Sequence, residues 1–203
     1  MRRVTVYSDY ACPWCYLGTA RLQSTITGSE GVEIEWVHFP LSPDTPPEGR
    51  DAVAYLSSRG IPVQPAIERL AQLCAEEGLA YSTQLRGRRI TNTQRAQELA
   101  LWAAERLDPE SMMALHRSLF RAYHVELRDL YDVDVLVAVA VEHGLDAEEV
   151  RGLFNPDAYA KRRLADWERA LAHGVRGVPT FARGERKLVG AQPRSSLNAF
   201  VSA

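Results

Sequence analysis

The chain has 203 residues, of which 46% are hydrophobic and 25% charged, and its formal net charge is −2. A chain of this length can bury a substantial core, as one large domain or as a smaller domain that carries an insertion. The charge balance lacks the basic excess that favours nucleic acids or anionic membranes as partners, so we expect neither. Asp9 interrupts the N-terminal segment before any apolar stretch of signal-peptide length, and no segment approaches the length of a membrane span. These features predict a cytoplasmic protein.

Two short runs near the N-terminus predict strands. Residues Val4–Tyr7 are β-branched and aromatic, and Val32–His38 alternates so that one face is apolar. Between them, Pro13 suits the first position of a helix that ends before Gly28. The order strand–helix–strand predicts a right-handed βαβ unit.

The hydrophobic period changes after the turn-rich stretch Pro40–Gly49, and roughly the next hundred residues show helical spacing. This change predicts a helical insertion. Gly144 resembles a C-terminal helix cap, and Asp146 followed by Glu149 resembles an N-terminal cap. Three apolar stripes mark the inserted helices: Ile67, Leu70, Ala71, Cys74 and Ala75; Ala96, Leu99, Ala100, Ala103 and Leu107; and Met112, Leu115, His116, Leu119 and Tyr123.

The C-terminal part returns to a mixed pattern. A helix is predicted from about Pro156 to His173, a hairpin from strands at Val178–Ala182 and Lys187–Val189, and a last helix after Pro193. We expect the first of these helices to bury its apolar residues, which are Ala160, Leu164, Trp167 and Leu171.

The three cysteines, Cys12, Cys15 and Cys74, cannot all pair within one chain. Structural disulfides are rare in a reducing compartment, so the close pair Cys12-Pro13-Trp14-Cys15 indicates catalysis or metal binding. Disulfide exchange requires a thiolate that attacks and a second thiol that resolves the mixed disulfide. A helix N-terminus favours a thiolate on Cys12, with Cys15 about one turn on. We therefore predict that Cys12 is the accessible nucleophile and Cys15 the resolving thiol.

Two simpler interpretations of the pair stay open. A structural zinc site would require two further ligands, and the sequence has neither a second Cys-x-x-Cys motif nor a closely spaced histidine pair. Cysteines that only pack in the core are the other interpretation. We interpret Cys74, His116 and His124 as core residues, because they lie on apolar stripes or beside aromatic residues. Trp14, next to the nucleophile, should be partly exposed.

The segment Asp9–Gly18, with the sequence DYACPWCYLG, resembles the active-site segment of DsbA-family proteins of the FrnE type. Gly177–Phe181 is similar to the substrate-binding loop of that family. Three shorter segments support the resemblance: Phe39–Pro43, Asn92–Thr93 and Gly190–Gln192.

The resemblance implies an α/β protein with a thioredoxin-like fold and an inserted α-helical domain. Residues 1–48 and 157–203 would form the thioredoxin-like domain, and residues 49–156 the inserted helical domain. It also implies a cis peptide bond between Val178 and Pro179, opposite the cysteine pair, where a proline presents no N–H near the thiols.

The resemblance further implies the site residues and partners. Cys12 and Cys15 would be catalytic, and no metal would be bound. The redox-active Cys12–Cys15 disulfide would need no bound cofactor, with glutathione as a co-substrate. The partners would be proteins or small molecules that carry a disulfide or a thiol. The substrate-binding residues would be Pro13, Trp14, Val178 and Pro179.

The chain departs from the family pattern at Gln97, where a histidine commonly follows the Asn-Thr segment, so the role of that histidine is not carried over. Trp14 stands where the founding DsbA members have a histidine, so no neighbouring imidazolium stabilises the Cys12 thiolate. Strong oxidising power is therefore not expected.

Two other classes of function compete with disulfide exchange. Glutathione-dependent isomerases such as 2-hydroxychromene-2-carboxylate isomerase, and kappa-class glutathione transferases, resemble this architecture but commonly have serine at the first cysteine position. The presence of both Cys12 and Cys15 favours redox chemistry, because an activated glutathione thiol needs no resolving cysteine. A non-catalytic interaction module would instead use an apolar groove beside the sheet. Replacing Cys12 with serine would leave such binding intact.

Overall fold

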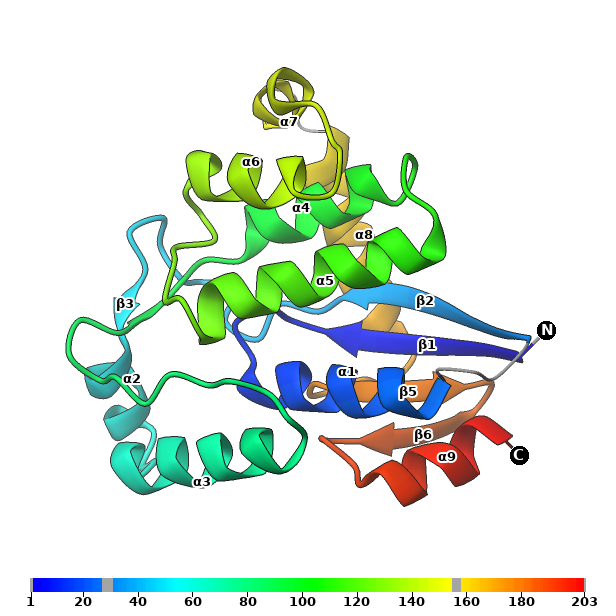
Figure 1. Cartoon of the computed structure of the whole chain (residues 1–203), viewed down its shortest axis with the longest axis horizontal. Coiled ribbons are helices and arrows are strands. Elements are labelled where there is room, and N and C mark those ends of the chain that lie inside the picture. Colours follow the sequence, from blue (N-terminus) through cyan, green and yellow to red (C-terminus); the bar gives the residue numbers. More distant parts are fainter. Residues whose placement is uncertain (1, 27–30, 155–157, 203) are drawn as a thin grey trace.

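A computed structural model describes residues 2–26, 31–154 and 158–202. Within these residues, four strands form one mixed sheet in the order β2-β1-β5-β6 (Figure 1). Strand β1 (Arg2–Ser8) pairs in parallel with β2 (Val32–His38) and antiparallel with β5 (Thr180–Arg183), which pairs antiparallel with β6 (Arg186–Val189). The sheet therefore joins the two ends of the chain and leaves β2 at one edge.

Helix α1 (Pro13–Ile26) connects β1 to β2 and confirms the predicted βαβ unit. Strand β2 has the predicted bounds, and β1 extends the predicted strand at both ends. Gly28, the predicted stop of the helix, lies outside the described residues. The predicted hairpin is confirmed as β5 and β6, which flank Gly184 and Glu185, and the predicted last helix is α9 (Arg194–Ser202).

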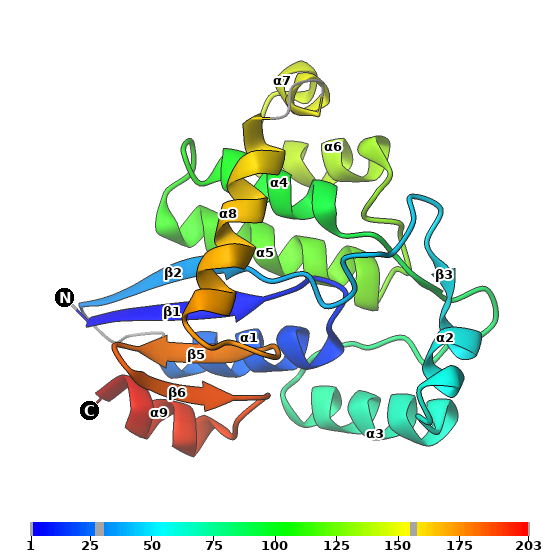
Figure 2. The ribbon, with the colours of Figure 1, turned by 180° about the vertical axis from the view of Figure 1, so that it is seen from behind.

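Helices cover both faces of the sheet. α1 and α9 lie on one face, and α8 (Ala158–Ala172) crosses the other (Figure 2). Along β1 the side chains alternate between these layers. Val4 and Val6 pack in the cluster that includes residues of α1 and α9, whereas Tyr7 packs in a second cluster with Ala170 of α8.

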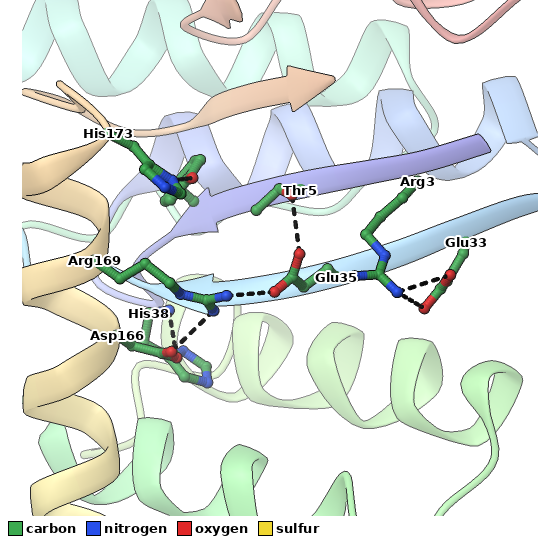
Figure 3. Close-up of polar contacts among 9 residues, drawn as sticks. Arg3, Thr5, Glu33, Glu35, His38, Asp166, Arg169 and His173 are labelled. Carbon is green, nitrogen blue, oxygen red and sulfur yellow. Dashed lines mark hydrogen bonds and ion pairs between the residues drawn. The ribbon is translucent and has the colours of Figure 1, made fainter. Parts of the chain in front are cut away.

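Ion pairs hold α8 to the sheet in addition to apolar contacts (Figure 3). Arg169 pairs with Glu35 of β2 at 2.6 Å and with Asp166, one turn earlier in α8, at 3.1 Å. Glu35 also accepts a hydrogen bond from the Thr5 hydroxyl of β1 at 3.1 Å, and Asp166 accepts one from the backbone N–H of His38 at 3.3 Å. Because each carboxylate is shared, these contacts fix α8 across the β1–β2 pair.

Helices follow β2 along the chain, as the change of period predicts. In chain order they are α2 (Ala52–Ser58), α3 (Val63–Glu76), α4 (Gln94–Ala103), α5 (Pro109–His124), α6 (Val133–Val141) and α7 (Ala147–Leu153). The predicted cap at Asp146 is confirmed, since its carboxylate accepts two N–H bonds at the start of α7. Buried residues of α3 to α7 share one cluster with Cys15 and Leu17 of α1, so these helices have a common core with α1. The division at residues 49–156 stays a prediction.

The buried face of α8 differs from the predicted apolar stripe. Leu164 and Leu171 are 43% and 37% exposed, whereas Arg163 is buried. The guanidinium of Arg163 pairs with Glu98 of α4 at 3.1 Å. The predicted burial is therefore wrong for Leu164 and Leu171, because α8 turns the ion-paired side chain of Arg163 toward the interior instead. The predicted start at Pro156 lies outside the described residues.

Two short strands are missing from the prediction. β3 (Arg50–Asp51) and β4 (Arg89–Ile90) pair antiparallel, and each is too short to show an alternating pattern. Gly49 has a φ of 72°, and a side chain there would meet the Ile90 carbonyl at 2.7 Å, so the turn requires glycine.

Two residues of the predicted apolar stripes differ from the prediction: Ala75 is exposed, and Leu107 lies beyond the end of α4. None of the described helices is long and apolar enough to span a bilayer.

The buried histidines predict a loss of stability in acid. Burial lowers the pKa of His38 and of His124 to about 3, and lowers that of His116 well below its usual value. The unfolded chain binds these protons near pH 6.5, about the unperturbed value. Stability that is fully present above this pH is therefore lost as the pH falls from about 6.5 toward 3. Each histidine contributes a slope of up to about 1.4 kcal/mol per pH unit.

Urea unfolding at about pH 7.5, 5.5 and 4.5 measures this slope. The variant His124→Phe keeps an aromatic ring next to Tyr16 and Phe120 but removes one titrating group. Its slope should be shallower than that of the parent by about one histidine's contribution. Parallel pH dependences of the two proteins would contradict a buried neutral His124.

Candidate active site

Cys12 lies immediately before α1, and Cys15 lies in the first turn of that helix. The Cys12 N–H donates to the Asp9 carbonyl at 3.1 Å, which closes a turn after β1. The Cys12 carbonyl then accepts from the N–H of Cys15 at 3.0 Å and from that of Tyr16 at 3.3 Å, which starts the helix. Pro13 occupies the first helical position, where the missing N–H removes no helical bond. The local sequence therefore places Cys12 at the helix N-terminus, as predicted.

Surrounding protein covers both thiols. Cys12 and Cys15 are free thiols that are 2% and 0% exposed. Cys12 is thus less accessible than the sequence predicts, because the segment at Val178 lies against it. Burial and the neighbouring Cys12 raise the pKa of Cys15 well above its usual value, whereas the backbone N–H of Asp9 and the Ser8 hydroxyl lower it. Cys15 is therefore held as the protonated thiol near neutral pH.

A segment from the other end of the chain lies next to Cys12. The Cys12 thiol donates to the Val178 carbonyl, with sulfur and oxygen 3.6 Å apart. The Val178–Pro179 peptide bond is cis, and the Pro179 carbonyl accepts from the Gly190 N–H at 2.7 Å. The Pro179 ring packs so close to α1 that a Cβ atom at Gly18 would lie 3.0 Å from Pro179 Cγ. The structure thus brings the predicted substrate loop and the first cysteine together.

The other residues singled out in the sequence lie in different surroundings. Trp14 is 43% exposed, as expected beside the nucleophile, and Pro13 is half-buried. Cys74 is buried in α3, and burial raises its pKa to about 11, which opposes a thiolate. His116 and His124 are buried in α5. Across the described ranges, no group of three or more His, Cys, Asp or Glu residues is placed to hold a metal ion.

Asp9 is a member of this site that sequence reasoning does not single out. Its side chain is buried, with 2% of the residue exposed, and lies three residues before Cys12. Burial raises the pKa of the Asp9 carboxyl, and the hydrogen bonds that it accepts lower it. The donors are the Ala11 N–H at 3.1 Å, the Leu41 N–H at 2.5 Å, the Thr93 hydroxyl at 2.6 Å and the Gln97 side-chain amide at 3.4 Å.

These bonds join three segments that are distant in the sequence: the turn before α1, the loop after β2 and the N-terminal end of α4. Gln97 also donates to the Thr93 hydroxyl at 3.2 Å, while its own carbonyl oxygen has no hydrogen-bond partner in the described part of the chain. The position of Asp9 ahead of a turn could have suggested the bond to Ala11, since aspartate caps local N–H groups. No local pattern could have indicated the bonds to Leu41 or Thr93.

The chain matches the family model of the DSBA-like thioredoxin domain over residues 3–201. It belongs to this family. The thioredoxin-like fold and the DsbA-family resemblance predicted from the sequence are therefore confirmed.

Individual relatives agree with this assignment. The probable DsbA oxidoreductase SCO1869 of Streptomyces coelicolor has a similar structure, with a TM-score of 0.91, 32% identity, and coverage of 100% of this chain and 89% of that one. The Bacillus subtilis protein YwbO is 26% identical over 98% of this chain and 95% of its own length.

Two further structures share the fold at lower identity. The cytosolic disulfide reductase DsbM of Pseudomonas aeruginosa, solved with GSH, has a TM-score of 0.72 and 21% identity, covering 98% of this chain and 97% of that one. A 2-hydroxychromene-2-carboxylate isomerase also has a TM-score of 0.72, with 19% identity and coverage of 98% and 94%.

The close contact between α1 and the Pro179 segment can be tested at Gly18. A Cβ atom there would lie 3.0 Å from Pro179 and 3.2 Å from Phe181. We predict that Gly18→Ala lowers the free energy of unfolding, because overpacking costs about 1–3 kcal/mol and exceeds the gain in helix propensity of about 1 kcal/mol. Urea unfolding measures the difference.

Gly152→Ala is the matched control. Gly152 lies in α7, and a Cβ atom there would meet nothing within 4 Å. This substitution should stabilise the protein by about 0.5–1 kcal/mol through helix propensity alone. Equal stabilisation by both substitutions would rule out the tight contact at Gly18.

Proposed function

We propose that this protein is a thiol–disulfide oxidoreductase in which Cys12 attacks and Cys15 resolves. The observation that carries the proposal is the position of the Cys12 thiol, at the N-terminus of α1 and 3.6 Å from the Val178 carbonyl. Unpaired N–H groups at a helix N-terminus stabilise a thiolate. The raised pKa of the buried Cys15 supports the same division of roles, because it keeps the second thiol protonated.

The exchange proceeds in two balanced steps. The Cys12 thiolate attacks one sulfur of a substrate disulfide, the substrate S–S bond breaks, and the other substrate sulfur leaves as a thiolate. Cys15 then loses its proton and attacks the Cys12 sulfur, which forms the Cys12–Cys15 disulfide and releases the second substrate thiolate. The substrate gains two electrons and the cysteine pair loses them. The reverse sequence oxidises a substrate dithiol.

We assign substrate binding to the residues around Cys12. The Val178 carbonyl, which accepts from the Cys12 thiol here, becomes free to accept from a substrate N–H once Cys12 is a thiolate or a disulfide. Pro179 presents no N–H next to the thiols. Beside the nucleophile lie Pro13 and the exposed Trp14 ring. They would contact the part of the substrate that leaves as a thiolate.

We further propose glutathione as the co-substrate that reduces the pair, in the cytoplasm, with no bound cofactor. The solved structure of the disulfide reductase DsbM contains GSH, which supports a glutathione step on this fold. The competing activity, a glutathione-dependent isomerase, has the same fold in 2-hydroxychromene-2-carboxylate isomerase. The presence of both Cys12 and Cys15 favours disulfide exchange, since an isomerase needs no resolving thiol.

The assignment of the nucleophile predicts the order of alkylation. A limiting amount of iodoacetamide under native conditions should label Cys12 ahead of Cys15 and Cys74, because burial raises the pKa of both other thiols. Mass spectrometry of peptides measures the order, and Cys12→Ser supplies the control, in which the fast-labelling fraction disappears. Faster labelling of Cys15 or Cys74 in the parent would show that the roles are assigned wrongly.

The assignment of the resolving thiol predicts a trapped intermediate. With Cys15→Ala, incubation with oxidised glutathione should accumulate a mixed disulfide on Cys12, because the attacking thiol is intact and the group that displaces glutathione is missing. Intact mass spectrometry detects the adduct, and Cys74→Ala is the matched control that should not accumulate it. A Cys15→Ala variant that converts substrate as fast as the parent protein would instead favour the glutathione-dependent isomerase.

A further inference from the structure

A cleft of about 740 Å³ lies beside strand β2, between this strand and helices α4 and α5. None of the residues proposed for thiol chemistry lines it. Successive residues of β2, such as Ile34 and Glu35, whose side chains point to opposite faces of the sheet, both line the cleft, so it follows the open edge of the strand. Figure 1 shows α5 running alongside β2. Most of the lining side chains are apolar, among them Ile34, Trp36, Leu101, Met112 and Met113.

The hydrogen-bond register of β2 shows which backbone groups face this edge. In a strand, the N–H and C=O of one residue point to the same side and those of the next residue to the other. Gly31 and Phe39, which flank β2, bond to β1 at 2.7 and 3.0 Å, so the odd-numbered residues of the strand face β1. The backbone groups of Ile34, Trp36 and His38 therefore point away from β1, along the cleft.

Among the hydrogen bonds of the described residues, one uses the outward backbone groups of Ile34, Trp36 and His38, and it lies at the C-terminal end of this edge. The N–H of His38 donates to Asp166 of α8 at 3.3 Å (Figure 3). Outside the β1–β2 ladder, no hydrogen bond found among the described residues uses the backbone of Ile34 or Trp36. Unpaired edge groups of this kind are a template for another strand. At the same end of the cleft, His116 has a buried Nε2 atom with no partner in the described chain.

The length and the charges of the cleft match an extended chain. From Val32 to His38 the lining spans six residue steps, about 20 Å at about 3.3 Å each. Two exposed charges stand on α5 along the same cleft, Glu110 in its first turn and Arg117 about two turns later. Neither forms an ion pair within the described residues. An extended segment with a basic residue near Glu110 and an acidic residue near Arg117 would complement them.

We propose that this cleft binds an extended segment of another polypeptide, which adds a strand to the free edge of β2. Main-chain bonds to Ile34 and Trp36 hold the segment, and its alternate apolar side chains pack on Leu101, Met112 and Met113. This mode of recognition takes affinity from the main chain and specificity from alternate side-chain contacts. The site goes beyond the proposed disulfide exchange, because it needs no thiol and lies apart from Cys12.

Fluorescence anisotropy with two cysteine-free peptides tests the proposal. Fluorescein-labelled TVKVTLDVT and its reverse, TVDLTVKVT, present the same alternating apolar residues with the two possible orders of charge. Their charges are four strand steps apart, about 13 Å, close to the rise of about 10 Å between Glu110 and Arg117 on α5. Each peptide matches Glu110 and Arg117 in only one strand direction, parallel or antiparallel to β2, and the main-chain bonds favour one of these directions. We therefore expect one of the two to bind the full chain at least about tenfold more tightly. N-methylation of alternate amides in that peptide should abolish binding when it blocks the amides that face β2. Methylation of the intervening amides should leave binding within about twofold.

Two leucine substitutions form a matched pair. Leu101→Lys places a charge in the cleft and should weaken binding at least about tenfold, whereas Leu164→Lys, on the exposed face of α8, should change it less than about twofold. The double substitution Glu110→Arg and Arg117→Glu, at two exposed positions, exchanges the two charges, so it should reverse the preference between the two peptides, and it does not depend on the fold of the Leu101 variant. These readouts involve no thiol, so they succeed or fail independently of the disulfide chemistry.

Three results would overturn the proposal. The first is no binding of either peptide up to about 1 mM, a limit that corresponds to about 4 kcal/mol of affinity. The second is equal weakening by Leu101→Lys and Leu164→Lys, or by both methylation patterns. The third is a dimer in sedimentation that Leu101→Lys dissociates, which would show that a second copy of the chain covers the cleft.

Discussion

The buried carboxyl of Asp9 is the constraint on which the geometry of the cysteine turn depends. A carboxyl without water is costly unless hydrogen bonds replace the lost hydration. Asp9 has no cationic partner in the described structure, and its bonds come instead from two backbone N–H groups, a hydroxyl and an amide. Because Leu41 and Thr93 supply two of them, the turn that carries Cys12 keeps its shape only while the loop after β2 and the start of α4 are in place. The start of α4 therefore helps to hold the cysteine turn, although this helix contributes neither cysteine.

The sequence predicts most of the framework, because the framework follows from local patterns. Strands β1 and β2, helix α1 and the β5–β6 hairpin have the expected types, and the Cys-Pro-Trp-Cys turn lies at the expected helix start. The prediction fails where a distant partner decides the outcome. Arg163 is buried on α8 because Glu98 of α4 faces it, and two exposed leucines take the positions that the apolar stripe assigns to the core. Glu98 is far away in the sequence, so no pattern within α8 could have indicated the pair.

The same reason separates the predictable part of the candidate site from the rest. A Cys-x-x-Cys pair at a helix start is a local signal with a known chemical use. The contact of Cys12 with Val178 was implied only by resemblance to a family, and the role of Asp9 had no signal beyond its neighbour Ala11. The coverage of Cys12 also depends on the distant Val178 segment, which is why the sequence overestimates the accessibility of this thiol.

The β1-α1-β2 unit carries both the cysteine turn and a free edge of the sheet. At the end of β1, the chain turns into α1 and places Cys12 at the N-terminus of this helix, beside the Val178 carbonyl. At the opposite edge of the sheet from β2, strand β6 carries the exposed charges Arg186 and Lys187, which discourage pairing with another chain. The edge at β2 differs: its two charges, Glu33 and Glu35, pair with Arg3 and Arg169 of the same chain. Ile34 and Trp36 lie there beside an apolar cleft, and Asp166 binds only the last outward N–H. Because a free strand edge beside apolar side chains favours association, the proposed added strand would pair the backbone groups of Ile34 and Trp36 that the sheet leaves open.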